Sequence, residues 1–380
     1  MRFSLQAHAA PTIWHKIGHV RWSLVALLCL LAAIGSVMLY SAADGALAPW
    51  AGRHALRFAV ALGLMLVVAL TDIRFWLRNA YALYLGVLLL LAVVEVSGTI
   101  GMGAQRWVDL GVINVQPSEL MKLALVLALA RYYHGLNPEQ VRRPVMVLLP
   151  LVMVGVPTLL ILKQPDLGTA VMLLAGGGAV IFAAGLSLWI VGLAMAAVMG
   201  ALPVAWQFLH DYQRARLLTF LDPDRDPLGA GYHITQSKIA LGSGGLFGKG
   251  YLHGTQSHLN FLPEKHTDFI FTMFAEEFGL VGTLTLLAVF AAVVGSCVAI
   301  ALRARNQFSR LLAIGVTTTF FLYVFINLAM VMGLIPVVGV PLPLVSYGGT
   351  AMLGVMLGFG LVLSVHVHRD VQIGRHSWGD

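Results

Sequence analysis

Ten apolar segments dominate this 380-residue chain and limit what it can fold into. A helix needs about 20 apolar residues to cross the hydrocarbon core of a bilayer. The chain is 59% hydrophobic and only 11% charged, whereas soluble domains carry about 25% charged residues. We therefore expect an all-α membrane protein, a single domain over residues 1–380, with ten transmembrane helices at roughly 22–42, 54–71, 79–97, 117–134, 144–162, 168–186, 188–209, 269–300, 311–334 and 343–366.

Lysine and arginine residues predict how these helices are oriented. With the N-terminus in the cytoplasm, most cations outside the long polar stretch described below fall on the cytoplasmic side. The short loops and helix ends of the opposite side hold only Arg53, Arg57, Arg106 and Lys163. This is the bias that the positive-inside rule describes, with both termini cytoplasmic. The same bias accounts for the net charge of +7, so we expect no nucleic-acid partner.

One long polar stretch, residues 210–268, separates the seventh and eighth predicted helices. It carries 12 of the chain's 41 charged residues, together with aromatic residues and many glycines and prolines. Loops of this length are usually functional or disordered, and the mixture of turns, aromatic residues and both charge signs favours order. The predicted orientation places it outside the cytoplasmic membrane, since long loops are translocated largely regardless of their charge. We expect the chemistry of the protein here.

Other predicted outer segments hold polar residues of two kinds. Trp107, on a segment with apolar Leu110 and Ile113, is suited either to the membrane surface or to ligand contact. Glu119 and Lys122 are three residues apart at the start of the fourth helix and therefore share a face. They could form a simple ion pair, but charges inside membrane helices usually face a cavity and mark function.

Three further carboxylates have two interpretations each, and one proline-rich segment predicts a cleft. Asp166 either caps the sixth helix or belongs to a site. Glu276 and Glu277, inside the eighth span, are either hydrogen-bonded structural groups or site residues. Residues 336–349 contain too many prolines for a helix, and non-helical backbone at membrane depth survives only against protein or a polar cavity. This predicts that the sequence Ser-Tyr-Gly-Gly at 346–349 lines an outward cleft.

Two familiar site motifs are not supported. Residues 242–250 superficially suggest a phosphate loop, but Ser243 stands at the first glycine position of the Walker pattern and Gly250 follows Lys249. The backbone amides of this loop could still contact a phosphate. His253 and His258 lack a third obvious ligand, so no zinc site is predicted.

Taken together, the polar segments resemble the family of shape, elongation, division and sporulation (SEDS) proteins, and within it the cell-elongation members. The matching stretches are GAQRWVDLG, QPSELMK, QPDLGTA, HDYQRAR, DPDRDPLGAGYHITQSKIALGSGGLFGKG, HGTQSHLNFLPEKHTDFIF, AEEFGLVG and PVVGVPLPLVSYGGT. The resemblance implies a peptidoglycan glycosyltransferase that polymerises lipid II during cell elongation. It also implies a partner, a class B penicillin-binding protein, and other membrane proteins of the elongation complex. The catalytic acid of the family falls on Asp268, and its substrate-binding residues fall on Trp107, Glu119, Lys122, Gln236 and Lys238.

The chemistry of lipid II agrees with these residues. The donor sugar is α-linked to pyrophosphate and the product is β-1,4-linked, so one in-line attack with inversion is sufficient. That step needs a general base for the acceptor 4-hydroxyl and positive charge at the leaving pyrophosphate. We expect Asp268 as the base, although it could instead cap the eighth helix, with Thr267 as the alternative cap. The candidate cations are Lys122, Lys238, Arg53 and Arg106, with or without a divalent ion such as Mg²⁺ or Mn²⁺.

Two other classes of function remain open from the residues alone. A lipid II flippase would also use many helices, intramembrane charges and an outward cleft, but it needs a polar path across the bilayer. The inner halves of the predicted helices are mostly free of charge. A scaffold without activity would leave Lys122 and Asp268 unexplained. The sequence thus favours a glycosyltransferase in the cytoplasmic (inner) membrane, surrounded by membrane lipid, with its active site facing outward.

Overall fold

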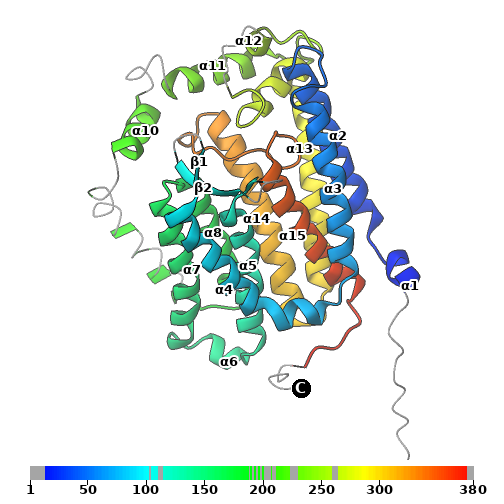
Figure 1. The fold of residues 1–380 in the computed structure, drawn as a ribbon, viewed down its shortest axis with the longest axis vertical. Coiled ribbons are helices and arrows are strands. Elements are labelled where there is room, and N and C mark those ends of the chain that lie inside the picture. Colours follow the sequence, from blue (N-terminus) through cyan, green and yellow to red (C-terminus); the bar gives the residue numbers. More distant parts are fainter. Residues whose placement is uncertain are drawn as a thin grey trace, which may run out of the picture.

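A computed structural model describes residues 13–101, 104–109, 114–187, 211–222, 230–258 and 264–374, with isolated positions between 189 and 207. Most of these residues form long helices that run side by side (Figure 1). The helices are α1 (Ile13–Gly18), α2 (Trp22–Ala42), α3 (Ala51–Leu70), α4 (Ile73–Ser97), α5 (Pro117–His134), α6 (Pro138–Val141), α7 (Val145–Lys163), α8 (Leu167–Ala183), α10 (Asp211–Leu221), α11 (Ala230–Ser243), α12 (Thr255–His258), α13 (Ile270–Arg303), α14 (Gln307–Val331) and α15 (Gly349–Val367).

Seven of the described helices are long and apolar enough to cross a membrane: α2, α3, α4, α7, α13, α14 and α15. Helix α8 is a shorter apolar helix of 17 residues. Helix α5 coincides with the fourth predicted span but carries Glu119, Lys122 and Arg131. Most of the seventh predicted span, 188–209, lies outside the described residues. The chain is thus a mostly helical protein with several candidate membrane spans.

The predicted starts of two helices were wrong by six residues. The third span begins at Ile73 rather than near residue 79, because Asp72 occupies the N-cap and its side chain accepts the Arg74 N–H at 2.8 Å. The last span begins at Gly349 rather than at residue 343. The prolines at 341 and 343 lack backbone N–H donors, so the chain there stays in turns before the helix begins.

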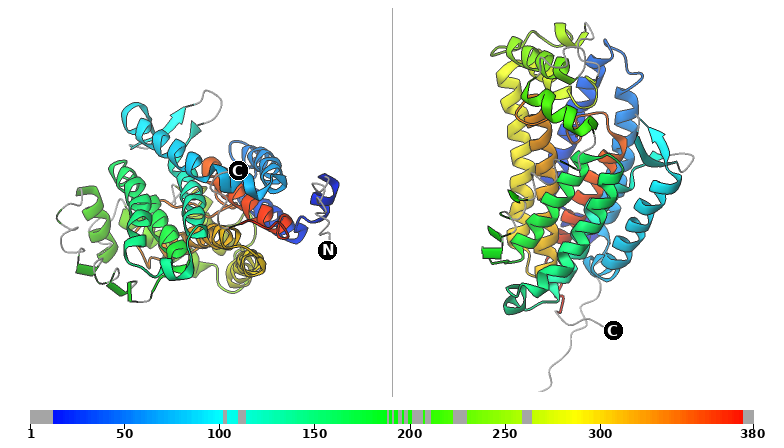
Figure 2. Two further views of the ribbon diagram at one scale, coloured as in Figure 1. Left: turned by 90° about the horizontal axis from the view of Figure 1, so that it is seen from below. Right: turned by 90° about the vertical axis from the view of Figure 1, so that its left-hand side faces the viewer.

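The expectation of a purely helical fold was also wrong in one segment. Three short strands, β1 (Thr99–Gly101), β2 (Ala104–Asp109) and β3 (Asn114–Val115), form an antiparallel sheet in the order β1-β2-β3. The strands lie at the flank of the bundle beside α4 (Figure 2). In a strand, successive side chains point to opposite faces. Trp107 lies on β2, where it pairs with Thr99 of β1. Leu110 and Ile113, which were predicted to share a membrane-surface segment with Trp107, lie outside the described residues.

Helix α14 is central to the packing, since it contacts α5, α8, α13 and α15. Small residues permit these close contacts, as is usual between membrane helices. A methyl group on Gly315 of α14 would collide with Val126 of α5 and Val180 of α8. Two glycines of α8 have the same role, because Gly176 lies against Thr319 and Gly177 against Val154. These two α8 glycines are therefore packed inside the protein.

A kink in α13 fixes the loop that follows α11. At Gly279 the backbone has φ 64° and ψ −162°, which interrupts the helix. The loop residues Lys249 and Gly250 donate their N–H groups to the exposed carbonyls of Glu276 at 3.0 Å and Glu277 at 3.1 Å. These two amides of the loop 242–250 are therefore occupied by the kinked helix, and a phosphate contact through them is not supported.

The bundle has two distinct polar ends. Helices α10, α11 and α12 lie at one end, and α1 and α6 lie at the other (Figure 1). We refer to the first as the loop end. The turn between α7 and α8, the segment 335–348 before α15 and the start of α13 belong to it as well, since they hydrogen-bond or pack against one another as described below. Polar segments that are far apart in the sequence thus meet at one end of the molecule.

Candidate active site

A buried ion pair joins Glu119 and Lys122 near the start of α5. Pro117 occupies the first turn, where its missing N–H costs nothing. The Lys122 Nζ lies 2.7 Å from the Glu119 Oε1, and the two side chains are only 3% and 8% exposed. The hydroxyl of Tyr323, from α14, donates to Glu119 Oε2 and accepts from Lys122 Nζ. The shared face predicted for Glu119 and Lys122 is confirmed.

This cluster borders a small cavity between α5, α14 and α15. Thr319, Gly354 and Gly358 are among the residues that line it. Its volume is about 20 Å³, and roughly one water molecule fits in a polar cavity of that size. The Glu119–Lys122 pair is therefore buried beside a cavity that holds about one water molecule.

Arg106 extends from β2 to the turn between α7 and α8. Its Nε donates to the Gln164 carbonyl at 2.8 Å, and its Nη2 donates to the Pro165 carbonyl. The Asp166 Oδ2 lies 3.9 Å from the Arg106 Nη1. Both hydrogen bonds from Arg106 to this turn thus go to main-chain carbonyls. Arg106 connects the small sheet to the helical bundle.

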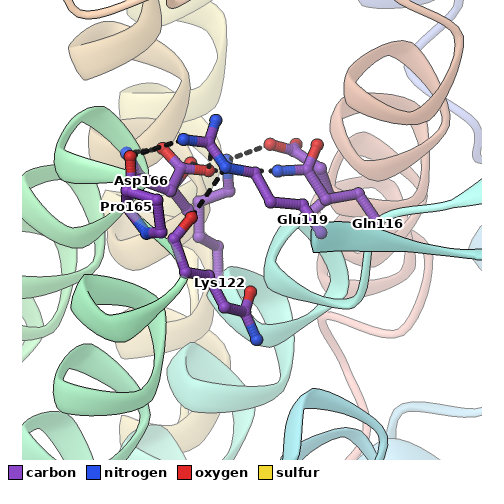
Figure 3. Close-up of polar contacts among 8 residues, drawn as sticks. Gln116, Glu119, Lys122, Pro165 and Asp166 are labelled. Carbon is purple, nitrogen blue, oxygen red and sulfur yellow. Dashed lines mark hydrogen bonds and ion pairs between the residues drawn. The ribbon is translucent and has the colours of Figure 1, made fainter. Parts of the chain in front are cut away.

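Asp166 caps helix α8, which confirms one of its two predicted readings. Its carboxylate accepts the Thr169 N–H at 3.1 Å and the Thr169 hydroxyl at 2.9 Å. The Gln116 side chain, directly before α5, also donates to it at 3.1 Å. Figure 3 shows Gln116 and Glu119 on one side and Pro165 and Asp166 on the other. The start of α5 and the start of α8 therefore meet through this carboxylate.

Asp268 belongs to a turn, residues 264–269, that leads into α13. The main chain of this turn is bound by the segment 335–348: Tyr347 N–H donates to the His266 carbonyl at 2.9 Å, and the Ser346 hydroxyl donates to the Thr267 carbonyl at 2.6 Å. Asp268 is half-buried, and a Cβ on Gly339 would lie 3.5 Å from its Oδ2. The carboxylate therefore lies beside the proline-rich segment, as expected of residues at the same end of the bundle.

The capping readings of Asp268 and Thr267 were wrong. Helix α13 begins at Ile270, so Phe269 occupies the N-cap position. The Thr267 hydroxyl instead donates to the Glu264 Oε2 at 2.7 Å. Asp268 stands one residue outside the cap, and its presence is not explained by the start of the helix.

Helix α14 brings the Asp268 turn and the Glu119–Lys122 pair close together. Tyr323 contacts the pair, and Asn327, four residues later, donates to the Asp268 carbonyl at 2.9 Å. Residues four apart lie on one face of a helix, about 6 Å apart along its axis. Neither Tyr323 nor Asn327 was predicted as a site residue. The sequence feature that could have identified both residues is a polar side chain within an apolar run.

Arg57, and not Arg53, contacts the proline-rich segment. The Arg57 guanidinium lies 4.9 Å above the ring of Tyr347, and a methyl on Gly349 would lie 3.0 Å from its Nη1. Arg53 is one turn earlier on α3 and exposed. Both arginines share a face by their spacing of four, but the structure gives the direct contact to Arg57.

Helix α11 places Gln236 and Lys238 over the end of α14. The intervening residue, Ser237, is fully buried and joins Thr272 of α13, at 2.8 Å, to the Val331 carbonyl of α14, also at 2.8 Å. Gln236 is half-buried and Lys238 is exposed, with its side chain lying across Gly333. Lys238 thus offers an exposed positive charge at the loop end.

The loop end therefore combines a half-buried carboxylate with cations of different accessibility. Lys238 is exposed, Arg57 is partly covered by an aromatic ring, and Lys122 is enclosed with a carboxylate. His266 stacks on Trp50 with ring centroids 4.4 Å apart, and burial together with nearby Lys265 lowers its pKa despite nearby Glu264. A carboxylate can accept a proton, and exposed cations can neutralise a departing anion.

Comparison with known proteins identifies the group to which the chain is related. Residues 21–371 match the family model for FtsW, RodA and SpoVE, described as cell cycle proteins. The chain is 46% identical to the peptidoglycan glycosyltransferase MrdB of Escherichia coli K12 over 362 residues, which cover 95% of this chain and 96% of that protein. It is 40% identical to a probable peptidoglycan glycosyltransferase FtsW of Thioalkalivibrio, over 93% of this chain and 91% of the relative.

Solved structures show the same fold. The crystal structure of the Thermus thermophilus rod shape determining protein RodA matches with a TM-score of 0.67 at 32% identity, covering 93% of this chain and 98% of that one. A chain from a study of a peptidoglycan synthase complex that coordinates polymerization and crosslinking matches with a TM-score of 0.76 at 36% identity, covering 92% and 98%. The chain belongs to the FtsW/RodA/SpoVE family of cell cycle proteins.

Proposed function

We propose that this protein is a peptidoglycan glycosyltransferase that polymerises lipid II into β-1,4-linked glycan during cell elongation. The 46% identity to a peptidoglycan glycosyltransferase over nearly the whole chain supports the reaction class. The observation that carries the proposal is the Asp268 turn, whose main-chain carbonyls are bound by the proline-rich segment and by Asn327, so that a half-buried carboxylate is held beside Gly339. A lipid-linked sugar presents its reacting atoms at the level where such a polar turn meets an apolar helix.

The proposed step is one displacement with inversion. Asp268 accepts the proton of the acceptor's 4-hydroxyl as that oxygen attacks C1 of the donor sugar. The bond between C1 and the pyrophosphate oxygen breaks, and undecaprenyl pyrophosphate leaves with its electron pair. Lys238 and Arg57 are the exposed cations that would stabilise the charge on the leaving group. No nucleotide is needed, because the bond to pyrophosphate is already activated.

For the other candidates we propose roles that follow from their contacts. Glu119 and Lys122 would act from within the protein, by fixing α5 to α14 through Tyr323. Arg106 would hold the sheet that carries Trp107 against the bundle, since its hydrogen bonds go to the turn before α8. Gln236 would contact substrate from α11, next to Lys238. Arg53 would serve as a second cation on the same face as Arg57.

The proposed topology has ten spans, both termini in the cytoplasm and the loop end outside. The distribution of lysine and arginine supports it, and so does the gathering of α10, α11 and α12 at one end of the bundle. Ser243 is exposed at that end, and Glu139 is exposed on α6 at the other. In a protein with Cys29 and Cys297 replaced by Ala, an impermeant thiol reagent added outside should label Ser243→Cys and leave Glu139→Cys unlabelled. The reverse pattern would refute the orientation.

We further propose a class B penicillin-binding protein as the partner, embedded with this chain in the inner membrane alongside other elongation proteins. The match to a chain from a synthase complex that coordinates polymerization and crosslinking supports an assembly of this kind. The test of the whole proposal is synthesis of glycan by the purified protein from lipid II, with and without this partner and with and without a chelator of Mg²⁺ and Mn²⁺. Glycan chains are the predicted product, whereas lipid II movement across liposomes without polymerisation would instead indicate a flippase.

A further inference from the structure

Asn327 is a buried polar side chain that the proposed reaction does not use. It lies on α14 in an otherwise apolar stretch and is 0% exposed. Its amide nitrogen donates two hydrogen bonds, to the Asp268 carbonyl at 2.9 Å and to the Val340 carbonyl at 2.7 Å. The first carbonyl belongs to the turn before α13 and the second to the proline-rich segment before α15. One side chain therefore ties two separate non-helical segments to one helix.

The first of these bonds completes a series on three consecutive carbonyls. The carbonyls of His266, Thr267 and Asp268 accept, in that order, from Tyr347 N–H, the Ser346 hydroxyl and the Asn327 amide. Each donor comes from the C-terminal part of the chain, more than 55 residues away along the sequence. Because each bond restrains one peptide group, the three together fix the main-chain direction from which the Asp268 side chain projects.

A second contact of α14 explains why this restraint matters for the site as a whole. Tyr323, one turn before Asn327 on the same face, holds both members of the Glu119–Lys122 pair. The same helix face therefore sets the position of the Asp268 turn relative to the buried ion pair. A catalytic group misplaced by about 1 Å can lose about 10²-fold in rate.

We propose that Asn327 is a positioning residue for Asp268. This inference rests on the proposed function, in which the Asp268 carboxylate accepts the proton of the acceptor hydroxyl. Asn327 acts through the main chain of Asp268 and not on the substrate. Its loss should therefore impair the chemical step and the protonation behaviour of the base, while leaving the binding of lipid II unaffected.

The test is Asn327→Leu, which is of similar size and removes both donors. The matched control is Thr317→Val, which removes another buried hydrogen bond of α14, from the Thr317 hydroxyl to the Ala313 carbonyl at 2.6 Å. Thr317 lies ten residues before Asn327, about 15 Å along the helix. Glycan synthesis from lipid II is measured for purified proteins of equal folded fraction, giving kcat, KM and the pH dependence of kcat.

The expected result for Asn327→Leu is a fall in kcat of about 10- to 100-fold, as for a displaced catalytic group. Its KM should stay near that of the wild type, and the acid limb of its pH profile should shift. Thr317→Val should keep both kcat and the profile. If Asn327→Leu loses no more kcat than Thr317→Val at equal thermal stability, or if its loss lies in KM alone, the positioning role is wrong.

A second variant covers the case in which Asn327→Leu does not fold. Asn327→Gln keeps both donors but moves them by one methylene, so it should fold and still lower kcat with an unchanged KM. A wild-type kcat for Asn327→Gln would then overturn the proposal. Failure of this inference can be distinguished from failure of the proposed function. If Asp268→Asn is active, Asp268 is not the general base. If Asp268→Asn is inactive but an Asn327 variant is fully active, only the positioning role of Asn327 is wrong.

Discussion

Asp268 and Glu276 lie eight residues apart at the start of α13, yet the protein holds them in opposite ways. The Glu276 side chain is fully buried, and its Oε1 accepts from Lys249 Nζ at 2.7 Å, from the Thr255 hydroxyl at 3.2 Å and from the Gln256 N–H at 3.0 Å. Asp268 is only half-buried, and its turn is fixed through main-chain carbonyls. One carboxylate fastens a loop to a kinked helix. The other is carried by a restrained backbone beside Gly339.

The difference shows that burial and ion pairing alone do not identify a catalytic carboxylate in this fold. Glu276 satisfies both criteria, and its partners account for it as a structural group, which confirms the structural reading of this residue. Glu277 is also buried, and its Oε1 accepts from the Ser41 hydroxyl at 2.5 Å. What distinguishes Asp268 is that the surrounding hydrogen bonds restrain its position through the peptide groups.

The largest expected effect on stability compares the two lysine–glutamate pairs. Lys122→Met leaves Glu119 buried in an apolar cluster without its cation, and breaking such a pair costs about 3–5 kcal/mol. Lys249→Met leaves Glu276 with its bonds from Thr255 and Gln256, so the cost should be smaller, about 1.5–3 kcal/mol. Chemical unfolding of both variants in the same detergent measures the two losses. Equal losses would show that the pairs are not structurally different.

A smaller effect is expected when the hydroxyl of Tyr323 is removed. Tyr323→Phe deletes one donor to Glu119 and one acceptor for Lys122, which should cost about 1–3 kcal/mol because both charged partners stay buried. The control is Tyr84→Phe, whose hydroxyl makes one bond, to the Met153 carbonyl at 2.8 Å, far from charges. The control should lose about 1 kcal/mol. Thermal unfolding of the two variants gives the ranking, and a greater loss for Tyr84→Phe would contradict it.

The smallest expected effect is a pH dependence from His266. The folded protein lowers the pKa of this imidazole, and its buried Nδ1 has no hydrogen-bond partner among the described residues. The His266 imidazole therefore binds a proton less readily in the folded protein than in the unfolded chain. The contribution of neutral His266 to stability is present above the unfolded pKa of about 6.5 and is lost as the pH falls below it.

His266→Phe keeps the stacking on Trp50 but cannot be protonated. Its melting temperature should therefore fall less between pH 7 and pH 5 than that of the wild type. Exposed His253, replaced by Gln, controls for the removal of any histidine from the same end of the molecule. If the His266→Phe and wild-type proteins lose the same stability on acidification, the turn before α13 does not depend on the neutral imidazole.

Much of the framework could be predicted from the sequence because it depends on local patterns. Long apolar runs predicted the helices, and the spacing of three placed Glu119 and Lys122 on one face. The kink at Gly279 could not be predicted, because glycine is common in membrane helices and the bonds that satisfy the kink come from loop residues 245–250. The short sheet was missed because Trp107 and its neighbours read as a membrane-surface element.

Residues that act through distant partners were the hardest to identify. Asn327 and Tyr323 stand in an apolar run, and their partners Asp268 and Glu119 are 59 and 204 residues away. Arg53 and Arg57 have the same chemistry and share a helix face, so only the position of Tyr347 distinguishes them. Sequence patterns could therefore place the candidate acid, but not the side chains that hold it.

The most direct measurement compares Asp268→Asn with Glu276→Gln in glycan synthesis from lipid II, at matched amounts of folded protein. Both changes remove a negative charge near the start of α13 and preserve size. Losing a general base costs about 10²–10⁴-fold in rate, so Asp268→Asn should be nearly inactive while keeping the melting temperature of the wild type. Glu276→Gln should melt at a lower temperature but retain most of its rate. A fully active Asp268→Asn enzyme would contradict the assignment of Asp268 as the base.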